Sequence, residues 1–375
     1  MKTAFERSEK TSPLPAQQGR ENRDTGRNRG KESWARVSAM AGAGVWAGLA
    51  VLARMGAARI GALELMFLLA PLVIVPLGME LESRIGGSSG LVEVARWMQP
   101  AGAICTAAAM WLPPGRKAGV VAAGWLIVCG LMAFAGVVEL GRLTQAEIPL
   151  LAKEARSGAS HVVLPGPDPG GGGFDFRSGQ VRAAVAIARI DLAVGGAWLV
   201  ASRLGMRPLG IQEPIGLLTA VHFHFAGFAT ATIAAATLRF AERRARQRWL
   251  RRVVGLVCCL PYVVAVGFVI SMALKMGAAI AFSASVAALA IFLREQAKQA
   301  QERTARALLY VASGAVFAGM VLAGAYAVAD FLGSDALTIP QMVRTHGILN
   351  AVGFCLPALL GWRVEGDGRT CQGGL

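Results

Sequence analysis

Charged side chains are scarce in this sequence. Asp, Glu, Lys and Arg together make up 16% of its 375 residues, while 54% of the residues are hydrophobic. Soluble domains carry about 25% charged residues. Uncharged runs of about 20 residues recur along the chain, and each is long enough to cross the hydrocarbon core of a bilayer as a helix. The composition excludes an ordinary soluble enzyme and predicts an all-α, polytopic transmembrane helical bundle.

Motifs that indicate a known chemistry are also missing. The six cysteines include no Cys-x-x-Cys pair, so paired zinc ligands and a thioredoxin-like pair are not expected. No His-Glu-x-x-His zinc motif occurs, so the sequence gives no support to an intramembrane enzyme acting on lipid. The glycine run 170–173 lacks the Lys-Ser/Thr of a phosphate-binding loop. Whether the protein is an enzyme stays open.

Basic residues are in excess, and the formal net charge is +15. They lie between the apolar runs, where the positive-inside rule explains them, so no nucleic-acid partner is expected. With the N-terminus inside, inner segments hold 28 of the 38 Lys and Arg residues and outer turns hold eight. This bias predicts a multi-pass protein of the bacterial inner (cell) membrane, about ten spans, with both termini cytoplasmic and the lipid bilayer as its partner. The expected spans are 34–53, 59–78, 97–112, 118–140, 185–204, 211–238, 253–274, 277–293, 307–331 and 340–362, the third and eighth being the weakest.

The rest of the chain is polar. Residues 1–33 are basic, lack the apolar segment of a signal peptide and are expected to form a disordered cytoplasmic tail. Residues 34–362 form the predicted transmembrane domain, which includes a long Gly/Pro-rich cytoplasmic loop at 141–182. Residues 363–375 are expected to be a second cytoplasmic tail.

Two of the four histidines lie deep in the sixth span. His222 is about 16 Å from the start of this span, close to the bilayer middle, where ionisable groups are costly and indicate function. His222 and His224 are two residues apart, so on a regular helix they point about 200° apart and cannot chelate one metal ion. Thr219 lies on the His222 face, so we include it among the candidate ligand-binding residues.

The tenth span carries a second polar motif. His346 and Asn350 form one helical stripe, and Asn350 is expected at the same depth as His222. If the two spans are neighbours, His222, His224, His346, Asn350 and Thr219 line one site, with Arg344 at its outer mouth. The alternative is that these side chains only fix helix packing through hydrogen bonds of about 0.6–2 kcal/mol each.

Two further features of the apolar runs stand out. Arg189 and Asp191 lie in the fifth span, where snorkelling could bring them to the interface. Asp191 is the better functional candidate because its side chain is too short to snorkel far. Pro71 and Pro76 in the second span predict a kink.

The segments Thr219–Phe228 and His346–Phe354 together resemble the YndJ-like family of bacterial membrane proteins. The resemblance covers most of the chain from the first span onward and implies a multi-pass topology, without implying a reaction. The segment Val221–Phe225 is also faintly similar to the His-x-His helix of haem–copper oxidase catalytic subunits, whose two histidines ligate different haems. That similarity implies His222, His224 and His346 as haem or metal ligands. This chain has too few histidines for a full oxygen reductase.

The leading hypothesis is an intramembrane His/Asn site for a small ligand or a proton, because histidine titrates near neutral pH. A haem- or metal-binding redox protein is the first alternative, and a structural or interaction protein is the second. A transporter with inverted repeats is compatible with five plus five spans, but no internal sequence repeat supports it. Cofactors and protein partners stay open.

Overall fold

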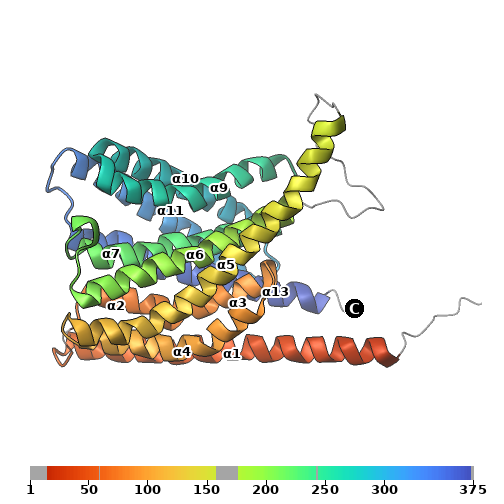
Figure 1. Ribbon diagram of the computed structural model, residues 1–375, viewed down its shortest axis with the longest axis horizontal. Coiled ribbons are helices and arrows are strands. Elements are labelled where there is room, and N and C mark those ends of the chain that lie inside the picture. The colour runs from red at the N-terminus through yellow and green to blue at the C-terminus, as the bar shows by residue number, and fades with distance from the viewer. Residues whose placement is uncertain (1–14, 59, 158–175, 242–243, 373–375) are drawn as a thin grey trace, which may run out of the picture.

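The computed structural model describes residues 15–58, 60–157, 176–241 and 244–372, and every regular element within them is helical. The helices run side by side along the long axis, with connecting turns gathered at two ends (Figure 1). The α-helices are α1 (Pro15–Arg54), α2 (Ala62–Leu69), α3 (Val75–Ile85), α4 (Gly90–Trp111), α5 (Arg116–Ser157), α6 (Phe176–Leu204), α7 (Ile215–His222), α8 (Thr230–Phe240), α9 (Arg244–Ile270), α10 (Met272–Gln299), α11 (Arg303–Phe331), α12 (Ile339–Met342) and α13 (Leu356–Gln372). A short 3₁₀ turn, η2 (Pro208–Gly210), and four π-helical segments, η1 (Ala70–Ile74), η3 (Phe223–Ala229), η4 (Val343–Gly347) and η5 (Leu349–Cys355), complete them.

Nine helical stretches of the described chain are long and apolar enough to cross a membrane. This confirms the predicted polytopic helical bundle. The third predicted span is the exception: α4 packs along α5, but polar residues occupy its first three turns, namely Glu93, Arg96 and Gln99. The nine stretches are Trp34–Arg54, Ala62–Ile85, Arg116–Ala146, Ser178–Leu204, Ile215–Phe240, Arg246–Ile270, Met272–Gln299, Arg303–Phe331 and Ile339–Gly366.

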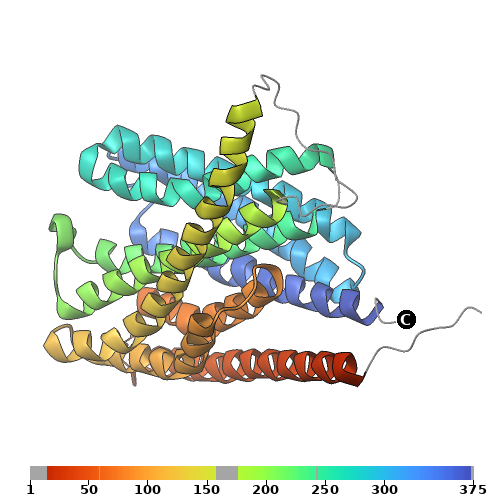
Figure 2. The ribbon, with the colours of Figure 1, turned by 45° about the vertical axis from the view of Figure 1, so that its right-hand side comes forward.

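The bundle has two distinct ends. We call the end that carries the turn 86–89, the start of α6 and the end of α13 the basic end, because the arginine-rich segment 239–252 lies there. The opposite end carries the turns 55–61, 112–115, 205–214 and 332–338. Helix α1 projects beyond the other helices at the basic end, and the last part of α5 rises out of the bundle, in both views (Figures 1 and 2). The predicted cytoplasmic side corresponds to the basic end.

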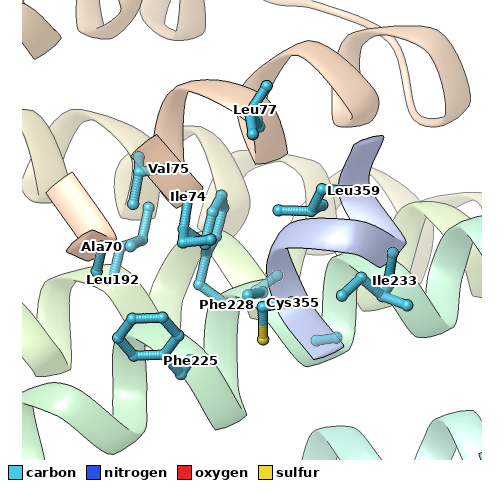
Figure 3. Close-up of a cluster of buried hydrophobic side chains, with 14 of the residues drawn as sticks. Ala70, Ile74, Val75, Leu77, Leu192, Phe225, Phe228, Ile233, Cys355 and Leu359 are labelled. Carbon is cyan, nitrogen blue, oxygen red and sulfur yellow. The ribbon is translucent and has the colours of Figure 1, made fainter. Parts of the chain in front are cut away.

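Two spans form the centre of the bundle. In Ala62–Ile85 and Ile215–Phe240, 72% and 78% of the apolar window is buried, compared with 17% in Trp34–Arg54. Phe228 of the span Ile215–Phe240 is fully buried and lies beside Ile74 and Cys355 (Figure 3). Gly78 permits this packing, since a Cβ there would lie 2.6 Å from the Phe228 ring. The central position explains why ionisable groups on these spans meet protein rather than lipid.

The four π-helical segments lie in three spans that pack against one another: η1 contacts η3, and η3 contacts η5. The kink predicted from Pro71 and Pro76 is present as η1. Pro76 has no N–H to donate, so the carbonyl of Pro71 is free for another donor. Gln99 of α4 fills this role, with its Nε2 2.6 Å from the Pro71 oxygen, and its Oε1 accepts a bond from Ser38 of α1.

Three predicted boundaries are wrong because helices continue beyond the apolar runs. Helix α1 begins at Pro15, so the disorder expected for 1–33 does not hold from that residue on, and 1–14 lie outside the described residues. The loop expected at 141–182 is shortened, since α5 ends at Ser157 and α6 begins at Phe176. The expected tail 363–375 is helical to Gln372, and Arg363 and Glu365 belong to the bundle. These extensions contain Glu, Gln and Arg, which favour helix without being apolar.

Candidate functional site

His224 is held by hydrogen bonds at both ring nitrogens. Its Nδ1 lies 2.8 Å from the Ala220 carbonyl oxygen and its Nε2 lies 2.9 Å from Nε1 of Trp125. An indole N–H only donates, so Nε2 accepts and Nδ1 carries the proton. The imidazole is therefore neutral, and neither nitrogen has a lone pair left for a metal ion. Both ring nitrogens of His224 are thus engaged within the protein, by Ala220 of its own helix and by Trp125 of α5.

The surroundings of His224 are correspondingly tight. The side chain is fully buried, and its ring meets Phe67 edge-on at a centroid distance of 4.9 Å. A Cβ at Gly195 would lie 2.5 Å from the His224 Nδ1. Helices α5, α6 and α2 thus close around this imidazole, so no ligand has access to it.

His222 has a different environment. It lies on the far side of the helix from His224, as the two-residue spacing predicts, and its side chain is exposed. Its Nδ1 bonds the Leu218 carbonyl oxygen at 2.7 Å, and Nε2 has no partner in the described part of the chain. Thr219 bonds the Ile215 carbonyl of its own helix at 2.8 Å. Of the three polar residues in this motif, His222 alone has a ring nitrogen available for exchange.

His346 and Asn350 form one unit. The His346 Nδ1 lies 2.8 Å from the Gly319 carbonyl oxygen of α11. The Asn350 Nδ2 lies 2.7 Å from the His346 carbonyl oxygen and 3.2 Å from the His346 Nδ1. A Cβ at Gly319 would lie 2.8 Å from the Asn350 Nδ2, so a glycine is required there. The predicted stripe is thus present on two successive π-helical segments, which often occur at functional sites.

The two motifs come together. The spans that carry the two motifs are neighbours, because η3 contacts η5. Helix α2 packs against both α7 and η4, and its Met66 fills the space left by Gly347. Arg344 is exposed on the same π-helical segment as His346. The structure therefore places His222 and the His346–Asn350 unit on neighbouring spans, and it directs His224 towards Trp125 of α5 instead.

The buried carboxyl of Asp191 lies about one helical turn further towards the basic end than His222. Asp191 of α6 is fully buried about 20 Å from the start of its span, near the bilayer middle. Its Oδ1 accepts a hydrogen bond from the Tyr262 hydroxyl at 2.5 Å, and its Oδ2 has no hydrogen-bond partner among the described residues. Asp191 packs on Gly227, and Tyr262 packs on Phe223 at a centroid distance of 5.8 Å. The sequence singled out Asp191, but nothing in the apolar run around Tyr262 indicated that it is a partner.

The buried ion pair of Glu82 and Arg189 lies still further towards the basic end. The Arg189 Nε is 2.9 Å from the Glu82 Oε2, and Thr232 donates to the Glu82 Oε1 at 3.1 Å. Arg189 also bonds the Gly87 carbonyl at 3.3 Å. The snorkelling expected for Arg189 is wrong, because the side chain is 4% exposed and compensates the fully buried Glu82. The pair joins α3, α6 and α8.

The three polar places lie at successive levels along the span Ile215–Phe240. His222 is at the first level, Gly227 beside Asp191 at the second, and Thr232 on Glu82 at the third. Five residues separate one level from the next, which corresponds to roughly 7.5 Å of helix. No group of three or more His, Cys, Asp and Glu side chains that could hold a metal ion occurs in the described ranges.

Comparisons with known proteins agree with this architecture. The family described as YndJ-like protein matches residues 65–354, a range that includes all three levels. The uncharacterized membrane protein YndJ of Bacillus subtilis (strain 168) is 30% identical over 185 residues, which are 48% of this chain. The match spans 33% of that relative's own length. No solved structure matches the chain.

Proposed function

The chain belongs to the YndJ-like family and is a multi-pass protein of the cell membrane, and from this premise we propose that it binds protons and passes them through the membrane interior. His222, His346 and Asn350 form the entry site on the side of the opposite end. Asp191 with Tyr262 is the next proton-binding group, and the Glu82–Arg189 pair follows towards the basic end. Arg344 lies at the mouth of the entry site.

One observation carries this proposal: three titratable places follow one another along the most buried span of the bundle. Ionisable groups at membrane depth are costly and are retained mainly for ion or proton movement. Asp191 supports the proposal most directly. It has no cation beside it and a carboxyl oxygen without a partner, so a bound proton is the simplest way to keep it neutral in this environment.

The entry site has the right chemistry for proton exchange. His222 offers an unpartnered Nε2, and its imidazole is exposed. Imidazole exchanges protons readily near neutral pH.

A small polar ligand at the entry site is the second candidate. Arg344 favours it, because an exposed guanidinium two residues before His346 suits an anionic group at the mouth. Thr219 contributes less, since its hydroxyl is already bonded within its helix.

The test is proton flux into liposomes that contain the purified protein and a pH-sensitive dye, driven by a potassium gradient with valinomycin. We expect His222→Gln and Asp191→Asn each to lower the flux by about tenfold or more. Asp330→Asn is the matched control, because Asp330 lies at the opposite end and pairs with Lys275 at 2.7 Å. Size-exclusion profiles identify variants that misfold. Wild-type flux no faster than that of empty liposomes would refute the proposal.

A further inference from the structure

A separate cavity of about 570 Å³ opens at the basic end between α4, α5 and α6. It shares Arg189 with the third place of the proposed proton path, and His222, His346 and Asp191 do not line it. The glycine- and serine-rich turn that joins α3 to α4 forms one wall, and α5 and α6 form the other. Its lining residues are Gly86, Gly87, Ser88, Ser89, Gly90, Leu91, Ala135, Val138, Glu139, Arg142, Arg182 and Arg189.

The cavity is positively charged. Three arginines line it against one glutamate. Arg182 forms an ion pair with Glu139 at 2.5 Å, and Arg189 forms one with Glu82. Arg142 is exposed and forms no ion pair or hydrogen bond within the described ranges. Helix α4 also starts at this wall, and the N-terminus of a 22-residue helix favours a negative group. The cavity is thus suited to an anion.

The membrane-facing side of the same cavity is apolar. Phe134 and Val137 of α5 are 59% and 55% exposed and directly precede the lining residues Ala135 and Val138. Val94 of α4 is 49% exposed and lies one turn after the lining residue Leu91. Because α4 and α5 pack side by side, the arginines adjoin a surface on which hydrocarbon chains can lie (Figure 1).

We propose that this cavity binds an anionic phospholipid, with the headgroup phosphate on Arg142 and Arg182. The acyl chains lie along Val94, Phe134 and Val137. The single negative charge of a diester phosphate matches the uncompensated Arg142, with Arg182 as a second donor, and the exposed apolar residues hold the chains. Basic pockets between transmembrane helices at the cytoplasmic side are suited to such headgroups. Inorganic phosphate has no acyl chains, so it gains no binding energy from these apolar residues.

The turn binds lipid and does not cleave it. Residues 86–90 match the letters Gly-x-Ser-x-Gly, but they connect two helices instead of a strand and a helix. No histidine lines the cavity, and the Ser88 hydroxyl donates to Glu93 at 2.8 Å. The turn therefore lacks both the strand-to-helix geometry and the histidine of a nucleophile elbow.

The test is native mass spectrometry of the delipidated protein titrated with phosphatidylglycerol, phosphatidylcholine or inorganic phosphate. We expect phosphatidylglycerol to bind more tightly than phosphatidylcholine, and inorganic phosphate not to displace it. The double variant Arg142→Gln/Arg182→Gln should lose roughly 30-fold in phosphatidylglycerol affinity, since each arginine near an anionic lipid contributes about 1 kcal/mol.

Arg248→Gln is the matched control, because Arg248 is exposed at the basic end and does not line the cavity. It should leave the affinity unchanged. Equal affinity for the two lipids, or an unchanged affinity in the double variant, would overturn the proposal. Displacement of the lipid by inorganic phosphate at similar concentration would assign the cavity to a soluble anion instead.

Discussion

The ion pair between Glu82 and Arg189 gives the sharpest test of the packing. Arg189→Met removes the cation while Glu82 stays buried with only Thr232 as a donor. Breaking one side of a buried pair costs about 3–5 kcal/mol, because the remaining charge is uncompensated. We expect a loss of that size in the free energy of unfolding, measured by denaturant titration in detergent micelles.

The comparison that isolates the pair is a double-mutant cycle with Glu82→Gln. The double variant should be more stable than Arg189→Met alone, because no buried carboxylate is then left unpaired. Arg182→Met is the control. The Arg182 side chain is 40% exposed, so loss of its ion pair with Glu139 should lower the free energy of unfolding by only about 0–1 kcal/mol. The reasoning fails if Arg189→Met costs no more than Arg182→Met, or if the two changes in the cycle are additive.

Two further predictions concern the histidine motifs. Trp125→Phe removes the donor to Nε2 of His224 and should lower the free energy of unfolding by about 1–3 kcal/mol, because a buried acceptor is left unsatisfied. A change smaller than the error of the denaturant titration would show that this bond does not stabilise the fold. Gly319→Ala should destabilise by about 1–3 kcal/mol, because the new Cβ lies 2.8 Å from the Asn350 Nδ2. Gly314→Ala on the same helix meets nothing within 4 Å and should be neutral or stabilising; equal melting temperatures for the two alanine variants would contradict the contact.

The apolar runs were enough to predict the architecture. A span needs about 20 apolar residues, so hydropathy locates it directly, and the positions of the spans agree with the structure to within a few residues at most ends. The ends themselves were missed at residues such as Arg363, because a helix can continue into polar sequence once it leaves the hydrocarbon. The opposite orientation of His222 and His224 followed from the helical period alone.

Partners far apart in the chain could not be predicted. Arg189 and Glu82 are separated by 107 residues, and Tyr262 and Asp191 by 71. No periodicity connects such pairs, because their contact depends on which spans are neighbours. The role of His224 was left open for the same reason, since its assignment needs the indole of Trp125. Family membership was predictable, because it rests on the two histidine motifs themselves.

The bond from Gln99 to the Pro71 carbonyl has a consequence for membrane insertion. Helix α4 carries Gln99 and Arg96 almost wholly buried, so on its own it gains little from leaving water for lipid. Its Gln99 amide is satisfied only once α1 and the η1 turn are in place beside it. Insertion of α4 is therefore a late step, coupled to folding of the earlier spans, and a chain that lacks them would leave this helix at the membrane surface.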